Sequence, residues 1–270
     1  MFDHEPVIRL GVFTGILLLM MLAEAAAPRR DQHYTRRQRW PNNLLMVVVD
    51  TLSVRLLFPV AAVGAAVMAN EQAWGLLNLA NLPVWLSVIL AVIALDLAIY
   101  LQHRVFHAVP WLWRLHRMHH ADLEFDVTTG LRFHPLEIVL SMAIKITVVV
   151  ALGAPALAVL IFEVILNATS MFNHGNVRLP QGLEQRLRRV VVTPEMHRVH
   201  HSIVPEETDS NFGFNFPWWD RLFGTYRDRP SAGHIGMVIG IEEFREPQDL
   251  RLDQMLIQPF RSTYRRSRSL

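Results

Sequence analysis

The chain has 270 residues, of which 51% are hydrophobic, and its mean hydropathy is +0.23. Both values are high for a soluble domain and indicate membrane-spanning segments. The formal net charge is only +2, and we expect no nucleic-acid partner. No cysteine is present, which excludes disulfides and thiolate-bound metals. Any metal must therefore be held by histidine, aspartate, glutamate, asparagine or water.

Apolar runs long enough to cross a bilayer follow one another from the N-terminus. A span needs about 20 mostly apolar residues, and such runs lie at about 7–27, 44–69, 82–101 and 136–171. The last run is broken at residues 153–155, which predicts two helices joined by a tight hairpin. A cleaved signal peptide is the alternative for the first run. We favour a retained helix, because its leading residues carry Asp3, Glu5 and only Arg9.

The arginines are distributed as the positive-inside rule requires of five spans. The segments 28–40, 102–135 and 172–270 hold five, four and fourteen arginines, and the loop 70–82 holds none. This alternation predicts an external N-terminus, with the histidine-rich segments and the basic tail 261–270 in the cytoplasm. The hairpin at 153–155 would either reach the far side or re-enter from the cytoplasmic side. Lys145 is the single lysine among 26 basic residues, a codon bias that favours a bacterial inner-membrane protein.

Histidines occur in a repeated pattern. The motif H-x2-H-H is present twice, as HRMHH at 116–120 and HRVHH at 197–201, and HRVFH at 103–107 precedes both. With thirteen histidines in the chain, one such triplet is expected by chance about 0.03 times. On a helix, positions i, i+3 and i+4 share one face, and an imidazole nitrogen reaches a metal at about 2.0–2.1 Å. H-x3-H therefore offers a pair of ligands and each H-x2-H-H offers three.

Together with the histidine of FNHGN, these motifs supply nine candidate metal ligands: His103, His107, His116, His119, His120, His174, His197, His200 and His201. Nine nitrogens exceed what one ion accepts, so two ions are predicted. Imidazole alone does not choose among zinc, copper, iron and nickel. Neither Glu-x-x-His nor HExxH occurs in the chain, which disfavours a soluble-type di-iron bundle and a zinc protease.

Polar residues on the third apolar run extend the histidine pattern into the membrane. Asp96, Tyr100, His103 and His107 are spaced +4, +3 and +4, which continues one helical face. A carboxylate inside a membrane segment is costly and points to function. We therefore expect Asp96 to accept a hydrogen bond from a ligand histidine or a metal-bound water, with Tyr100 beside it.

The remaining histidines are less telling. His134 is either a ligand or a supporting residue that acts with Glu137. His4, His33 and His234 are interpreted as ordinary polar residues at the membrane edge.

The alternative function of a different class is a membrane metal-binding or metal-transport protein. Transporters place ionisable residues near the midplane of several helices, whereas only three ionisable residues lie deep in the apolar runs here: Asp96, Lys145 and Glu163.

These motifs, in this order along the chain, resemble those of the fatty acid hydroxylase/sterol desaturase superfamily of integral-membrane di-iron oxygenases. The resemblance covers about 85–260 and rests on HRVFH, HRMHHAD, FHPLE, FNHGNVRLP, TPEMHRVHHS and NFGFNFPWWDRLFGTYRD. It implies one all-α membrane domain over 1–270, a bundle of four to five apolar helices whose cytosolic helical cap holds a histidine-rich di-metal site. The segment 1–84 would supply N-terminal transmembrane helices. The same nine histidines would be the metal ligands.

The chemistry implied by the resemblance is oxidative. Two iron ions would activate O2, the co-substrate, to hydroxylate or desaturate a C–H bond of a fatty acyl chain, a sterol or a related apolar lipid. Zinc would be a misloaded metal. Electrons would come from a separate cytochrome b5-like or ferredoxin-like protein. The substrate-binding residues, the lipid and the oligomeric state are not predicted by any motif.

One position departs from the superfamily pattern. Many members place a histidine four residues before the one that matches His174, and this chain has Ser170 there. Asn173, Asn167 or a water would complete the coordination, or one ion would keep a more open site. Glu163, Asn167 and Ser170 share a face of the last apolar helix, where they either line that side of the site or form interhelical hydrogen bonds.

The aromatic segment 216–223 resembles a landmark of the superfamily. We expect Trp218, Trp219 and Phe223 to pack the cytosolic cap under the metal site. Asp220 and Arg221 are expected to form a structural ion pair.

Overall fold

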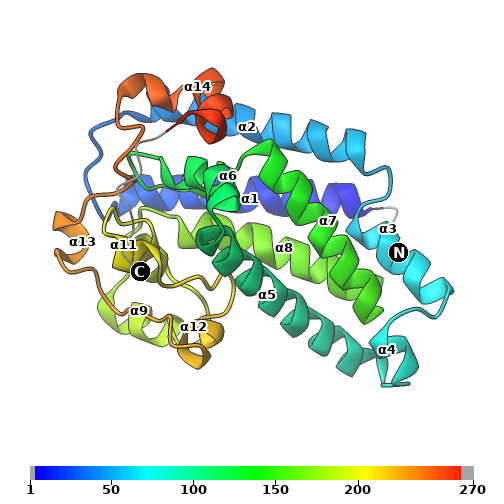
Figure 1. The fold of residues 1–270 in the computed structure, drawn as a ribbon. Helices are drawn as coiled ribbons and strands as arrows, with labels where there is room; N and C mark the ends of the chain where they lie inside the picture. Colours follow the sequence, from blue (N-terminus) through cyan, green and yellow to red (C-terminus); the bar gives the residue numbers. More distant parts are fainter. Residues whose placement is uncertain (1–3, 263–270) are drawn as a thin grey trace.

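A computed structural model describes residues 4–262, and these residues form helices and loops with no β-strand among them (Figure 1). The long helices are α1 (Glu5–Ala26), α2 (Arg36–Leu57), α3 (Ala62–Glu71), α5 (Val84–Ala108), α7 (Pro135–Leu152) and α8 (Ala156–Asn173). The predicted all-α class is confirmed. Residues 263–270 of the predicted basic tail lie outside the described residues.

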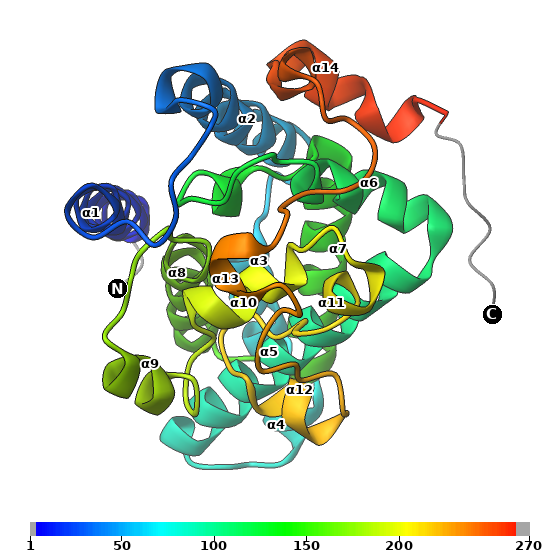
Figure 2. The same cartoon turned by 90° about the vertical axis from the view of Figure 1, so that its left-hand side faces the viewer.

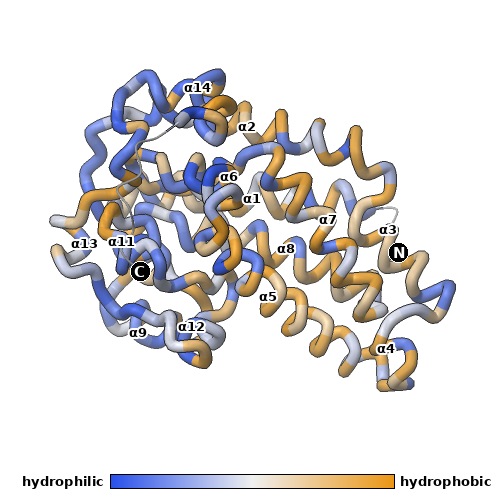
Figure 3. Tube along the Cα trace, viewed as in Figure 1, coloured by the Kyte–Doolittle hydropathy of each residue, from blue (hydrophilic) through white to orange (hydrophobic). Residues whose placement is uncertain are grey.

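The long helices lie side by side and carry apolar side chains on their outer faces. Among the described residues, five segments are long and apolar enough to cross a membrane: 5–26, 36–79, 84–108, 135–152 and 156–173. Figure 3 shows the apolar residues concentrated along these helices and the polar residues at one end of the bundle. Large apolar side chains such as Leu56 and Leu22 are 80% and 69% exposed, as expected of a surface that contacts lipid.

The second predicted span, 44–69, is two helices rather than one. The helix α2 begins earlier, at Arg36, where Thr35 and Gln38 form a capping box. It ends at Leu57, before Pro59, because a proline lacks the N–H that a helix interior needs and disfavours helical geometry in the residue before it. The chain then continues in α3. The third span runs beyond its predicted end at 101 to Ala108.

The hairpin between α7 and α8 lies at the end of the bundle opposite the histidines. Gly153 caps α7 in the left-handed conformation, with φ 63°. A Cβ at this position would lie 2.3 Å from the carbonyl oxygen of Trp74, so only glycine fits. The amide of Asn70 donates to the carbonyl of Ala154 at 3.2 Å. The hairpin therefore lies against the end of α3 and the loop that follows it.

Short helices at the other end form a cap (Figure 2). They are α6 (Pro110–His120), α9 (Gln181–Leu187), α10 (Pro194–His200), α11 (Pro205–Thr208), α12 (Trp218–Leu222), α13 (Gly233–Gly236) and α14 (Leu252–Ile257), with 3-10 turns η1 (Thr129–Leu131), η2 (Pro247–Leu250) and η3 (Gln258–Phe260). The remaining short helix, α4 (Leu76–Leu79), lies at the hairpin end. The cap encloses the ends of α5 and α8 that carry the histidines.

Asp96 and Tyr100 of α5 both form hydrogen bonds with the cap. The Asp96 carboxylate accepts a hydrogen bond from Trp219 Nε1 at 2.8 Å, not from a histidine. The hydroxyl of Tyr100 pairs with Thr225 Oγ1 at 2.8 Å, and its ring stacks on Phe223. These bonds join the membrane helix to the α12 region, so both residues position the cap. Trp219 and Phe223 pack as predicted.

The predicted ion pair between Asp220 and Arg221 is wrong. Asp220 accepts hydrogen bonds from the backbone amides of Phe212 and Gly213, each at 2.8 Å. Arg221 instead donates to the carbonyl oxygen of Arg188 at 3.0 Å. Neighbours in sequence on a helix point in different directions, and the buried carboxylate satisfies the backbone of the loop it faces.

Candidate metal centre

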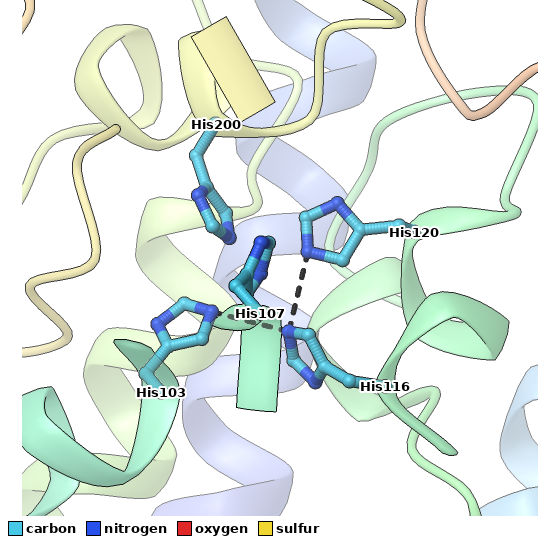
Figure 4. A group of neighbouring side chains, drawn as sticks. All are labelled: His103, His107, His116, His120 and His200. Atoms are coloured by element: carbon cyan, nitrogen blue, oxygen red, sulfur yellow. Dashed lines mark hydrogen bonds between the residues drawn. The ribbon is translucent and has the colours of Figure 1, made fainter. Parts of the chain in front are cut away.

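The nine candidate histidines lie together in the cap, all of them buried, and they divide into two groups. The five-histidine group contains His103, His107, His116, His120 and His200, and Figure 4 shows their rings pointing toward one another. The four-histidine group contains His119, His174, His197 and His201. Within each group, the candidate ligand atoms lie within 4.8 Å of one another.

Each H-x2-H-H triplet is divided between the two groups. In the first triplet, His116 and His120 belong to the five-histidine group and His119 to the other. In the second triplet the division is reversed, since only His200 joins the five-histidine group. Helical geometry explains the division: with 3.6 residues per turn, positions i+3 and i+4 point about 100° apart. The two triplets thus hold the two groups beside each other.

Protein acceptors orient most of the rings through Nδ1. The Nδ1 atoms of His103, His119, His174 and His200 lie 2.8, 3.1, 2.8 and 2.8 Å from the backbone carbonyl oxygens of Phe212, Arg132, Ser170 and Ser210. A carbonyl oxygen only accepts, so each Nδ1 carries the proton and donates it. The Nε2 atom is then left without a proton. Rings held in this way are typical of metal-ligating histidines.

Carboxylates orient two further rings of the five-histidine group. Glu137 Oε1 lies 2.7 Å from His116 Nδ1, and Asp209 Oδ1 lies 3.1 Å from His107 Nδ1. The contact of Glu137 agrees with its predicted supporting role. Asp209 was not predicted, because it lies 102 residues from His107 in sequence and belongs to no histidine motif.

Within each group, two unprotonated Nε2 atoms face each other. His119 Nε2 and His174 Nε2 are 3.2 Å apart, although both rings donate from Nδ1 to carbonyl oxygens. His103 Nε2 and His116 Nε2 are likewise 3.1 Å apart. Two lone pairs at this distance repel unless a cation lies between them. Two nitrogens that each lie about 2.1 Å from one ion, at about 90–110°, are about 3.0–3.4 Å apart, so the spacing fits a shared metal.

Burial favours the neutral form of several of the candidate histidines. Burial lowers the pKa of His119, His120 and His201 well below the ordinary value. It also lowers the pKa of His174 and of His200 to about 3. A neutral imidazole is the form that binds a metal. The buried ring nitrogens without a hydrogen-bond partner include His107 Nε2 and His200 Nε2, and such orphaned acceptors fit metal ligands better than packing residues.

Two other predicted candidates lie outside both groups. His134 caps α7: its Nδ1 accepts from the Leu136 amide at 3.2 Å, and its Nε2 donates to the Leu256 carbonyl at 3.1 Å. Both ring nitrogens are therefore used, and His134 is not available as a ligand. Asn167 is exposed and donates to the Glu163 carbonyl within its own helix at 2.9 Å, so it serves helix packing.

Asn173 is the one candidate amide near the centre with a free acceptor. It is fully buried, its Nδ2 donates to the Phe214 carbonyl at 3.1 Å, and its buried Oδ1 has no hydrogen-bond partner. It immediately precedes His174, so it remains a candidate for a ligand or for a partner of metal-bound water.

Of the three histidines interpreted as ordinary polar residues, His4 and His33 are exposed. His234 is buried, with Nε2 3.4 Å from a Glu195 carboxylate oxygen.

A buried ion-pair network supports the loop between the first triplet and α7. Arg39 of α2 is fully buried and pairs with both Asp122 and Asp126. Burial opposes ionisation of Asp122, but Arg39 and Arg132 hold its pKa well below the usual range. Asp122 follows the triplet by two residues, so this network fixes the end of α6. The network escaped prediction because its partners lie more than 80 residues apart.

Comparison with known proteins identifies the family. The family model for fatty acid hydroxylase matches residues 88–225, just over half of the chain, and this range contains all nine candidate histidines. The chain belongs to the fatty acid hydroxylase family. The resemblance noted from the motifs is confirmed, and family membership together with the five apolar segments makes the chain an integral membrane protein.

Relatives with assigned activities act on different lipids. The chain is 32% identical over 158 residues to ornithine lipid hydroxylase OlsE of Rhizobium tropici, covering 58% of this chain and 47% of that protein. It is 26% identical to alkylglycerol monooxygenase of Xenopus tropicalis, covering 73% of this chain and 44% of the relative. It is 25% identical to rat cholesterol 25-hydroxylase, covering 55% and 49%. The matches span about half of each relative. No solved structure matches the chain.

Proposed function

We propose that this chain is a membrane-bound di-iron oxygenase that uses O2 to hydroxylate or desaturate a C–H bond of a lipid. The observation that carries the proposal is the pair of buried histidine groups, at one end of an apolar bundle, in which unprotonated Nε2 atoms face one another. Membership of the fatty acid hydroxylase family supports the reaction class. Relatives named for ornithine lipid, alkylglycerol and cholesterol support a lipid substrate.

Some residues of the chain would bind the metal ions, and others hold those ligands in position. The five-histidine group would hold one iron and the four-histidine group the other, and the pair would supply the electrons that O2 activation requires. Glu137 and Asp209 accept hydrogen bonds from Nδ1 of His116 and His107, which makes Nε2 a better metal ligand and holds each ring in place. The buried cap excludes bulk water from the groups. Zinc would bind the same imidazoles as a misloaded metal.

The environment of the site completes the proposal. We place the histidine end in the cytoplasm of a bacterial inner membrane, because the arginine-rich segments 28–40, 102–135 and 172–270 lie toward that end. Electrons would come from a separate cytochrome b5-like or ferredoxin-like protein.

Metal transport is less well supported. Glu163, the deepest acid of α8, is paired with Lys145 at 2.7 Å and with Arg9 of α1. A paired acid that ties three helices together has a packing role, whereas a transport path needs ionisable groups that face a cavity near the midplane. The histidines lie at one end of the bundle rather than along it.

Metal content and oxygen chemistry test the proposal together. Protein from iron-replete cells should carry about two irons per chain and oxidise a membrane lipid only when O2 and an electron donor are present. His200→Ala should remove activity and lower the iron content. Tightly bound zinc with no lipid oxidation after iron reconstitution, or metal flux into proteoliposomes, would sink the proposal. Comparing the lipids of a deletion strain with those of the parent would identify the substrate.

A further inference from the structure

A groove with an apolar lining runs along the bundle between α5, α6 and α7. Its volume is about 440 Å³, within the range of about 300–1,000 Å³ that small-molecule pockets occupy. The apolar walls include Leu101, Val105, Phe106, Trp111 and Leu140. Gln102 is the one polar residue among the residues that line it.

The groove opens sideways onto the lipid-facing surface. Leu101, Val105 and Trp111 line it and are 44%, 47% and 62% exposed. They belong to the same exposed apolar surface that covers the rest of α5, where Val84 and Ile89 are 71% and 48% exposed. Hydrocarbon is the medium around a membrane-spanning segment, so a groove on this surface takes up a hydrocarbon chain rather than water or a polar ligand.

The inner wall of the groove adjoins the five-histidine group. Phe106 is 2% exposed, and its ring centroid lies 6.2 Å from that of His116 in an edge-on contact. Gln102 precedes His103 in α5, and Leu140 lies one helical turn after Glu137, whose carboxylate orients His116. The helices that form the groove therefore also supply ligands and their support. A chain in the groove is separated from the group by one layer of side chains.

We propose that this groove binds one hydrocarbon chain of the lipid substrate and guides it toward the five-histidine group. The inference rests on the proposed function, because it names the route by which the lipid reaches that centre. Gln102 anchors the wall: its Nε2 donates to Ser141 Oγ on α7 at 2.8 Å. This bond turns the amide of Gln102 toward α7 and leaves the groove wall apolar.

Photo-crosslinking tests the groove without relying on catalysis. The full chain is reconstituted in phosphatidylcholine vesicles with palmitic acid that carries a diazirine in mid-chain, and crosslinked residues are mapped by mass spectrometry. Crosslinks should concentrate on the groove faces of α5 and α7 and should be competed by unlabelled palmitate. Ile144→Trp, which fills the groove from α7, should reduce them at least about tenfold. Ile89→Trp, the same change on α5 outside the groove, should not.

Metal content separates a blocked groove from a misfolded protein, because Ile144→Trp should retain the wild-type metal content. The proposal that the groove binds the chain would be overturned by crosslinks that spread evenly over all exposed apolar faces and are unaffected by Ile144→Trp. An unchanged KM for lipid oxidation in that variant would also overturn it, and the proposed function would then stand. Saturable groove crosslinks in a metal-loaded protein that oxidises no lipid would overturn the proposed function and leave the groove in place.

Discussion

Ser170 donates its hydroxyl proton to the carbonyl oxygen of Gly130 at 2.7 Å, and its own carbonyl accepts from His174 Nδ1 at 2.8 Å. Ser170 therefore ties α8 to the η1 turn with its side chain and orients a histidine with its backbone. The position where the superfamily resemblance leads us to expect another histidine holds a packing contact here. The four-histidine group keeps one ligand fewer than its neighbour.

Replacing Gly130 by alanine should damage the four-histidine group selectively. A Cβ at this position would lie 2.5 Å from the Ser170 carbonyl oxygen and 2.9 Å from His174 Nδ1. His174 must move to relieve this overlap, so Gly130→Ala should lose about half of the bound metal by elemental analysis. Gly182→Ala is the matched control, because a Cβ there meets nothing within 4 Å. A full metal complement in Gly130→Ala would contradict the placement of His174.

Paired substitutions within the first triplet should reveal its division between the groups. His119 belongs to the four-histidine group, and His116 and His120 belong to the five-histidine group. Replacing His116 and His120 together by alanine should remove one ion and leave the other. Replacing His119 and His120 together should weaken both ions, although the number of deleted ligands is the same. Equal residual metal in the two double variants, measured by elemental analysis, would refute the division.

Local spacing predicted the histidine cluster but not its internal arrangement. The three spaced motifs predicted eight of the nine buried histidines, because i, i+3 and i+4 spacing is a property of a single helix. Which ion each nitrogen faces depends on how the helices cross, and that depends on packing distributed over the bundle. The break at Pro59 followed a local rule that the hydropathy run concealed.

The hydrogen-bond partners of buried polar groups were harder to predict than the histidine cluster. Asp96 was expected to accept from a ligand histidine or from a metal-bound water, and one of its oxygens accepts from Trp219, 123 residues away in sequence. His134 was expected to be a ligand or a supporting residue, and Leu136 and Leu256 use both of its ring nitrogens. A buried polar atom must find a partner, but the sequence alone does not say which of the distant candidates the tertiary fold brings near.

Glu137 should strengthen metal binding through His116. Its Oε1 lies 2.7 Å from His116 Nδ1, and loss of such an outer carboxylate typically lowers metal affinity about 10–100-fold. Glu137→Ala should therefore lose metal from the five-histidine group at a lower chelator concentration than wild type. Glu137→Gln keeps an acceptor but no charge and should fall between the two. Glu206→Ala, an exposed carboxylate in α11, is the control. Chelator curves that superimpose for all four proteins would rule this role out.

Acid should destabilise the metal-free protein through the buried histidines. Burial lowers the pKa of His197 and His201 well below the ordinary value and lowers that of His174 and His200 to about 3. The unfolded chain takes up protons on these groups below about pH 6.5, while the folded chain does not. Stability is therefore fully present above that pH and falls as the pH drops toward 3, by about 1.4 kcal/mol per pH unit for each such histidine.

A comparison of pH slopes isolates this effect from the carboxylates. Chelator-treated wild type and a variant with His197→Asn and His201→Asn would be unfolded in detergent by heat at several values between pH 7.5 and 5. The variant is expected to start less stable and to lose stability less steeply, because two of the proton-accepting groups are gone from its unfolded state. Parallel slopes would show that these imidazoles titrate alike in the folded and unfolded chain, which a buried, uncharged histidine group does not allow.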